Sequence, residues 1–122
     1  MTAPAEVFRQ LVDGVVGKKW DQLPLLYAED AVVVHPFSTD PAVARLEGRE
    51  QVRAHFARAA EMNVDFRAED VVVHETTDPE VVIGEFVYRG TLGEQEVTMP
   101  AILVLRVRDG LIVSSRDYAG SR

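Results

Sequence analysis

The sequence predicts an α+β domain, in which three helices near the N-terminus pack on one face of a curved, mostly antiparallel β-sheet. Apolar residues recur at helical spacing in much of the first half of the chain, whereas after residue 65 they alternate in the two-residue period of strands. Short turn sequences separate these later segments. A chain of 122 residues is long enough for one core, so residues 1–122 are expected to form a single domain.

Three segments have helical character. Residues 3–17 carry one apolar stripe and begin with Pro4, which suits a first helical turn. A second, short helix is expected at about residues 20–27, where Pro24 is tolerated if it falls in the first turn. A third helix is expected at residues 49–62, again from apolar side chains on one stripe.

The predicted strands come mainly from the second half of the chain. Residues 31–35 read as a short strand, and residues 36–47 read as a loop broken by two prolines. The turn sequences TTDP, LGEQ and RDG then divide the remainder into four strands. These strands are expected at residues 66–75, 81–92, 96–108 and 111–118. A curved sheet closed by helices encloses a cavity between the two layers.

Composition narrows the possible functions. The net charge is −7 and no cluster of basic and aromatic residues occurs, so nucleic-acid binding is not expected. The absence of cysteine excludes disulfides and thiolate chemistry, and three scattered histidines predict no metal site. The N-terminal sequence MTAPAEVFRQ does not resemble a signal peptide, and no apolar run reaches membrane-spanning length. A cytoplasmic protein without membrane contact is therefore expected.

Three segments carry a resemblance to a known family: WDQLPLLYAEDAVVVHP, LEGREQVRAHF and ILVLRVRDGLIVSSRDY. Together they resemble the SnoaL-like branch of the nuclear transport factor 2-like superfamily, which also contains steroid delta-isomerases and limonene epoxide hydrolases. The likeness extends from Phe8 to Tyr118 and implies the cystatin-like cone fold with an internal pocket. Because this fold hosts many activities and also inactive proteins, the resemblance specifies the fold better than the reaction.

Comparison with steroid isomerases implies a different mechanism here. The segment similar to YAEDAVVVHP carries an aspartate base in those enzymes, where this chain has His35. The positions that match the two oxyanion donors are Leu11 and about Leu103, both apolar. Without donors to a developing enolate that mechanism loses its largest contribution, so negligible isomerisation of 3-oxo-Δ5-steroids is expected.

Asp117 is the first candidate for a catalytic base. Alternate residues of LIVSSRDY face opposite sides of the sheet, which groups Ser115 with Asp117. The resemblance implies that this set faces the cavity, where burial would raise the pKa of the carboxyl group and make it a useful base. SnoaL-type cyclases use a cavity aspartate in this way. The alternative is an aspartate at a frayed strand end, facing water.

Two histidines complete the set of candidate catalytic residues. His35 ends a strand that opens onto the cavity in this fold, and it is either an acid–base group or the partner of a loop carbonyl. His55 lies on the apolar stripe of the third helix, where it is either a pocket residue or a core histidine with its hydrogen bonds satisfied.

The remaining candidates line the pocket or lie outside it. Tyr27, Phe56, Phe86 and Tyr88 are interpreted as core or pocket wall, and with Leu103 and Ser115 they are the expected substrate-binding residues. Arg116 and Tyr118 fall on the outer face of the sheet, through which members of the superfamily often form homodimers. A homodimer is therefore expected.

Three functions remain open at this point. The first is an acid–base enzyme that needs no cofactor and acts on a small, largely apolar substrate, by ring closure or isomerisation. The second is a non-catalytic domain that binds a small apolar molecule. The third, epoxide hydrolysis, requires an Asp–Arg–Asp arrangement in the pocket. Because Arg116 and Asp117 are adjacent on a strand and point to opposite faces, this function ranks last.

Overall fold

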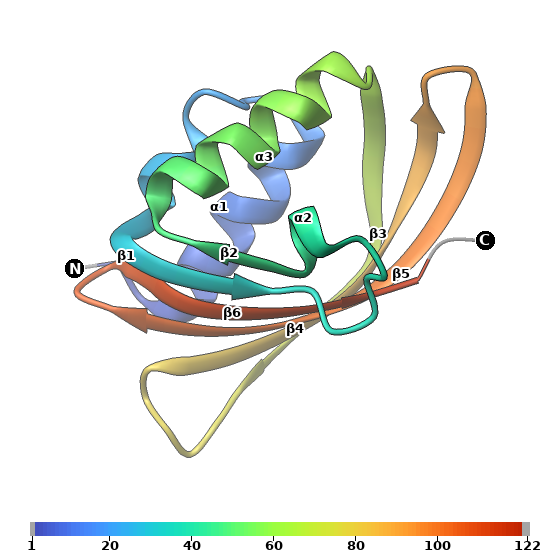
Figure 1. Ribbon diagram of the computed structural model, residues 1–122. Coiled ribbons are helices and arrows are strands. Elements are labelled where there is room, and N and C mark those ends of the chain that lie inside the picture. The colour runs from blue at the N-terminus through green and yellow to red at the C-terminus, as the bar shows by residue number, and fades with distance from the viewer. Residues whose placement is uncertain (1, 121–122) are drawn as a thin grey trace.

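The computed structural model describes residues 2–120 and shows helices packed against the inner face of one bent sheet (Figure 1). The helices are α1 (Pro4–Val16), the 3₁₀-helix η1 (Leu23–Leu26), α2 (Pro41–Ala44) and α3 (Arg49–Glu61). The strands are β1 (Tyr27–Val34), β2 (Arg45–Glu47), β3 (Val64–Glu75), β4 (Val81–Leu92), β5 (Gln95–Arg108) and β6 (Leu111–Ala119). The predicted α+β class is confirmed.

The six strands form one sheet in the order β2-β1-β6-β5-β4-β3. Every neighbouring pair is antiparallel except β1 and β6, which are parallel. In Figure 1 the sheet bends upward at the end formed by β3, β4 and β5, so that α1 and α3 lie within its curvature. No helix within residues 2–120 is long and apolar enough to cross a membrane.

Two segments between α1 and α3 differ from the prediction. The second helix is only one 3₁₀ turn, and Tyr27 already belongs to β1, because it pairs with Ile112 of β6. The predicted loop at residues 36–47 contains α2 and β2. The Asp40 carboxylate accepts a hydrogen bond from the Ala42 amide at 2.9 Å and caps α2. Leu46 is buried in β2, paired with β1.

The core is built from one stripe of α1 and the inner face of the long strands. Phe8 is fully buried, and its ring lies 5.8 Å from that of Phe86. Alternate residues of β5 from Ala101 to Val107 are buried against the helices, as strand periodicity requires. Gly84 faces Phe8 directly, and a Cβ at this position would overlap the phenyl ring. The missing side chain therefore lets α1 approach the sheet.

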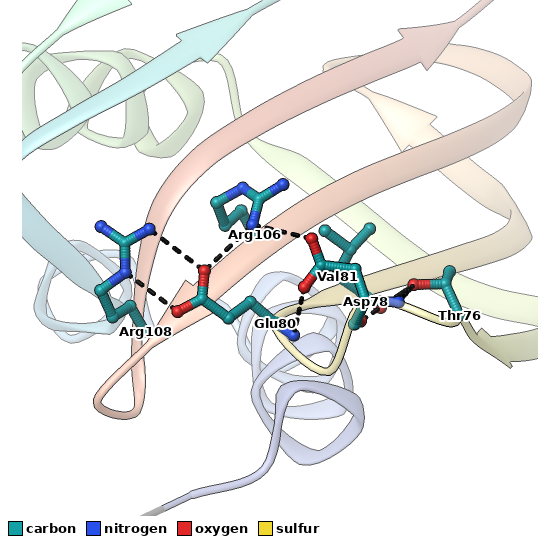
Figure 2. Close-up of polar contacts among 6 residues, drawn as sticks. All are labelled: Thr76, Asp78, Glu80, Val81, Arg106 and Arg108. Carbon is teal, nitrogen blue, oxygen red and sulfur yellow. Dashed lines mark hydrogen bonds and ion pairs between the residues drawn. The ribbon is translucent and has the colours of Figure 1, made fainter.

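Charged side chains hold the turn between β3 and β4 against β5 (Figure 2). Arg106 lies 3.0 Å from carboxylate oxygens of both Asp78 and Glu80. Arg108 makes two hydrogen bonds to Glu80, at 3.0 and 3.1 Å. These bonds, first from Arg108 and then from Arg106, lower the pKa of Glu80 to about 2. Within the turn, the Thr76 hydroxyl accepts from the Asp78 amide at 3.2 Å.

Replacing Gly84 by alanine tests the close approach of α1 to the sheet. We expect Gly84→Ala to lower the free energy of unfolding by about 1–3 kcal/mol, because the rigid, fully buried ring of Phe8 has no room to yield. Chemical denaturation measures the change. Adding Phe8→Leu is expected to make the two effects less than additive. Strict additivity would show that the methyl group does not meet Phe8.

Candidate functional site

A cavity of about 550 Å³ lies between the helices and the inner face of the sheet. Its wall is mostly aliphatic and aromatic, and the size is within the range of small-molecule sites. A few side chains supply its polar and charged groups: Tyr27, His35, Asp40, His55, Arg58, Tyr88 and Asp117. A mostly apolar cavity with a few polar groups suits a small, largely apolar ligand.

His35 and Asp117 meet because β1 and β6 run parallel. The register pairs Val34 with Arg116. The residues that follow them, His35 and Asp117, therefore lie side by side on the inner face of the sheet. The His35 Nε2 atom is 3.5 Å from Asp117 Oδ2. Both side chains are about four-fifths buried, with exposed fractions of 21% and 18%. This parallel pairing therefore builds an acid–base pair in the cavity wall.

The orientation of His35 is set by the segment around α2. Its Nδ1 atom lies 2.6 Å from the carbonyl oxygen of Val43, and its backbone amide donates to Ala44 at 2.9 Å. A carbonyl oxygen only accepts hydrogen bonds, so Nδ1 carries a proton. In a neutral ring, Nε2 then presents its lone pair toward Asp117. The two facing atoms, Nε2 and Oδ2, are therefore placed to exchange a proton once one of them has taken it up.

Ser115 supports the other oxygen of Asp117. Its hydroxyl donates to Asp117 Oδ1 from two residues earlier on the same face of β6. Burial raises the pKa of Asp117, while the bond from Ser115 and the nearby His35 act in the opposite direction. The net direction is upward, which brings the carboxyl group closer to the pH at which a general base works best.

His55 packs against His35 across the cavity wall. The ring centroids are 5.4 Å apart, and Phe56 meets the His55 ring edge-on at 5.8 Å. Burial, His35 and Arg58, in that order, lower the pKa of His55 to about 4. His55 is therefore neutral at pH 7. Among residues 2–120, its Nδ1 is the buried side-chain nitrogen or oxygen atom that has no hydrogen-bond partner.

Two tyrosines add hydroxyl groups to the same wall. Burial raises the pKa of both Tyr27 and Tyr88, and the nearby Asp117 raises them further. Both phenols therefore keep their protons and can donate hydrogen bonds. Tyr88 packs edge-on against Phe86 at 4.7 Å, and Tyr27 lies 6.2 Å from Phe56.

The structure places nearly all the candidate residues around one cavity. His35, His55 and Asp117 are brought together, and the expected wall residues all line it: Tyr27, Phe56, Phe86, Tyr88 and Leu103. Ser115 was expected to contact the substrate. Its side chain is instead only 1% exposed, and its hydroxyl donates a hydrogen bond to the Asp117 carboxylate. Arg116 and Tyr118 belong to the other set of alternating residues in β6; Arg116 is exposed and Tyr118 packs on Phe37.

Several wall residues were not among the sequence candidates, and two of them bear on the site. Trp20 stacks on Phe56 of α3 at 6.4 Å and lines the cavity. Arg58 lies three residues after His55 on α3, and this i, i+3 spacing could have placed it on the same face from the sequence. Within the described part of the chain, no group of three or more His, Asp or Glu side chains is arranged to hold a metal ion.

The burial of Asp117 predicts how its replacement changes stability with pH. Because folding raises the pKa of this carboxyl group, its contribution to stability is full at low pH and is lost as pH rises through the folded value. We expect Asp117→Asn to gain stability relative to wild type as pH rises. Thermal unfolding of both proteins between pH 4 and about pH 8 measures this difference. A difference that shrinks with rising pH would contradict the raised pKa.

The lowered pKa of His55 predicts that the protein loses stability as pH falls, the opposite of the pH dependence expected from Asp117. Its pKa is about 4 in the folded protein against an ordinary value of 6.5, so the unfolded chain takes up the proton first. Stability should therefore fall as pH drops from 6.5 to about 4, by roughly 3 kcal/mol at ~1.4 kcal/mol per pH unit. His55→Phe should remove this part of the acid sensitivity, and the exposed-site control His74→Asn should retain it. Equal acid sensitivity of wild type and His55→Phe would refute the assignment.

Comparison with known proteins places the chain in a family. A family model described as a SnoaL-like domain matches residues 8–115. An uncharacterised PhzA/B-like protein of Pseudomonas aeruginosa is 36% identical over 95 residues, which cover 76% of this chain and 67% of that protein.

Solved structures agree on the fold. A candidate isomerase from Bacillus subtilis superposes with a TM-score of 0.88 at 24% identity, covering 96% of this chain and 86% of its own. A hypothetical protein from Catenulispora acidiphila with a ketosteroid isomerase-like fold, solved with trimethylamine, gives a TM-score of 0.77 at 25% identity, with the same two coverages. The chain therefore belongs to the SnoaL-like domain family and has its cone-shaped, ketosteroid isomerase-like fold.

Proposed function

We propose that the protein is an acid–base enzyme that removes and returns a proton at carbon in a small, largely apolar substrate. The observation that carries this proposal is the contact between Asp117 Oδ2 and His35 Nε2, at 3.5 Å, in the wall of a mostly apolar cavity. Burial raises the pKa of Asp117, so its carboxylate is a stronger base than one in water. The SnoaL-like family is compatible with both ring closure and isomerisation.

The proposed step balances without an oxidant or reductant. Asp117 Oδ2 takes a proton from a carbon next to a carbonyl group; the C–H bond breaks, an O–H bond forms, and the electron pair moves onto the carbonyl oxygen as an enolate. Protonated phenols of Tyr27 and Tyr88 are available in the same wall to donate to that oxygen. In ring closure the enolate carbon then attacks a second carbonyl, a C–C bond forms, and Asp117 gives its proton to the new alkoxide oxygen. In isomerisation Asp117 returns the proton to another carbon.

His35 adjusts the protonation state of Asp117 in this scheme. Its Nδ1–H bond to Val43 holds the ring with Nε2 toward the carboxyl group. When Asp117 receives the substrate proton, Nε2 can accept it in turn, so that the proton is held for return to the product. Ser115 keeps the second carboxylate oxygen occupied and leaves Oδ2 free for the substrate.

A second candidate function is ligand binding without turnover. The size of the cavity and its largely aliphatic and aromatic wall favour it equally, because they require only an apolar ligand. Epoxide hydrolysis has less support. Arg116 is exposed and belongs to the strand face opposite Asp117. The cavity also contains Asp40 and Arg58, but the Asp40 carboxylate is bonded to the Ala42 amide as the cap of α2.

Proton exchange at carbon tests the enzyme proposal without knowledge of the natural substrate. Small cyclic ketones and 1,3-diketones are incubated with the protein in D₂O, and the loss of the α-proton signal is followed by NMR. We expect wild type to accelerate exchange of at least one compound, and Asp117→Asn to reduce that rate by about 10²–10⁴-fold. The exposed-carboxylate control Asp30→Asn should match wild type. Binding of these compounds with no accelerated exchange would favour the ligand-binding function.

The pH profile of the same reaction tests the role of Ser115. The hydroxyl of Ser115 lowers the pKa of Asp117, so its removal leaves the carboxyl group protonated to higher pH. We expect Ser115→Ala to move the acidic limb of the rate–pH profile to higher pH while preserving the rate at the plateau within a few fold. A profile that does not move would show that Ser115 does not act on the reacting carboxylate.

A further inference from the structure

The two histidines of the cavity wall differ in what their ring nitrogens contact. His35 has a hydrogen bond on Nδ1 and the Asp117 carboxyl group near Nε2. His55 has neither kind of partner at Nδ1, which is buried and unpaired within residues 2–120. Yet the His55 ring lines the cavity, only 5.4 Å from the ring of His35. The two rings therefore cannot have equivalent roles.

The surroundings of His55 decide its charge. His35 approaches it from the end of β1, Arg58 lies one turn further along α3, and the aromatic ring of Phe56 closes one side. The two neighbours that act on its pKa, His35 and Arg58, are both basic, and the Asp117 carboxyl group lies near Nε2 of His35. A second positive charge at this place would be poorly solvated and repelled. His55 therefore stays neutral across the physiological range.

A neutral imidazole has one N–H group, and burial decides where it sits. A proton on Nδ1 would leave an enclosed donor without an acceptor, and such orphaned N–H groups are rare in proteins. A proton on Nε2 leaves only an unused lone pair at Nδ1, which is tolerated more easily. Because Nδ1 is enclosed while the ring lines the cavity, Nε2 is the polar atom left to face it.

We propose that His55 is a fixed, uncharged hydrogen-bond donor whose Nε2–H group binds a carbonyl oxygen of the substrate. This inference rests on the proposed function, and it narrows the substrate class to uncharged, mostly apolar carbonyl compounds. The carbonyl oxygen lies at His55, and the acidic carbon beside it lies toward Asp117. His35 and His55 then have opposite tautomers: Nε2 accepts in His35 and donates in His55.

The role differs from that of a general acid. A neutral N–H group polarises the carbonyl and stabilises the enolate oxygen without giving up its proton. Proton transfer is left to the Asp117–His35 pair. His55 binds the carbonyl oxygen, whereas Asp117 acts on the carbon beside it. Removal of His55 therefore weakens binding of the carbonyl group but leaves the base in place.

The tautomers can be measured without any substrate. The chain has only three histidines, so long-range ¹H–¹⁵N correlation spectra of the full-length protein contain three ring systems, and His55→Gln assigns one of them. Between pH 6 and pH 8 we expect His55 to carry its proton on Nε2 with an unprotonated Nδ1 and no change with pH. His35 should show a protonated Nδ1. A protonated Nδ1 in His55, or an imidazolium at pH 7, would overturn the proposal.

Binding of 1-indanone and its matched hydrocarbon, indane, tests the carbonyl contact. We expect 1-indanone to shift the His55 Nε2–H resonance and to bind more tightly than indane, by roughly three- to tenfold for one neutral hydrogen bond. His55→Phe should reduce that preference, because only the donors Tyr27 and Tyr88 remain, while still binding indane. His55→Gln, whose amide N–H replaces the Nε2–H group, should retain part of it, whereas His55→Asn should not.

The outcomes separate this inference from the proposed function. A shift at Nε2–H and a reduced preference in His55→Phe support the donor role even if no compound undergoes proton exchange. Accelerated exchange without either effect supports the enzyme and overturns the donor role. Equal binding of 1-indanone and indane, or binding of neither, overturns the carbonyl contact.

Discussion

The parallel pairing of β1 with β6 is the constraint on which the site depends. All other neighbouring strands are antiparallel, and this pair places the first strand of the sequence beside the last one. The register places His35 beside Asp117 on the concave face, although the two residues are 82 positions apart in the sequence. A slip of one residue along β6 would turn Asp117 to the outer face, because strand side chains alternate. The backbone hydrogen bonds of this pair thus determine the geometry of the acid–base site.

Burial then gives neighbouring groups different protonation behaviour. The same apolar wall raises the pKa of Asp117 and lowers that of His55, since both changes favour the neutral form. His35 is distinguished by two contacts, the Val43 carbonyl on one side and the carboxyl group on the other. Asp117 and His35 are therefore placed to exchange a proton, whereas the protons of His55 and of the two tyrosines stay in place. This division suits chemistry in which one group moves a proton while others hold an oxygen.

Membership of the SnoaL-like family accounts for the architecture, while the reaction depends on the groups in the cavity. Leu11 and Leu103 occupy wall positions that would hold oxyanion donors by resemblance to steroid isomerases, and both are apolar here. The polar groups of this cavity come instead from β1 and the segment between β1 and α2, and from α3, β4 and β6. Relatives with the same cone can thus differ in substrate without any change of fold.

The sequence alone predicted the class of fold, the order of the long elements and the grouping of Ser115 with Asp117 on one face of β6, while the family resemblance implied that this face is the inner one. Residue periodicity and turn chemistry are local, and each is visible within some ten residues, as in LIVSSRDY. The strand expected at residues 31–35 lies within β1 apart from its last residue, but local pattern failed at the neighbouring segments η1, α2 and β2, which are each four residues or fewer and depend on contacts between elements. Only the tertiary structure decided that His35 adjoins Asp117, that Ser115 supports a carboxylate rather than a ligand, and that His55 Nδ1 is sealed. Each of these features depends on which elements pack together in space, or on the enclosure of one atom from all sides. A local pattern of residues carries neither kind of information.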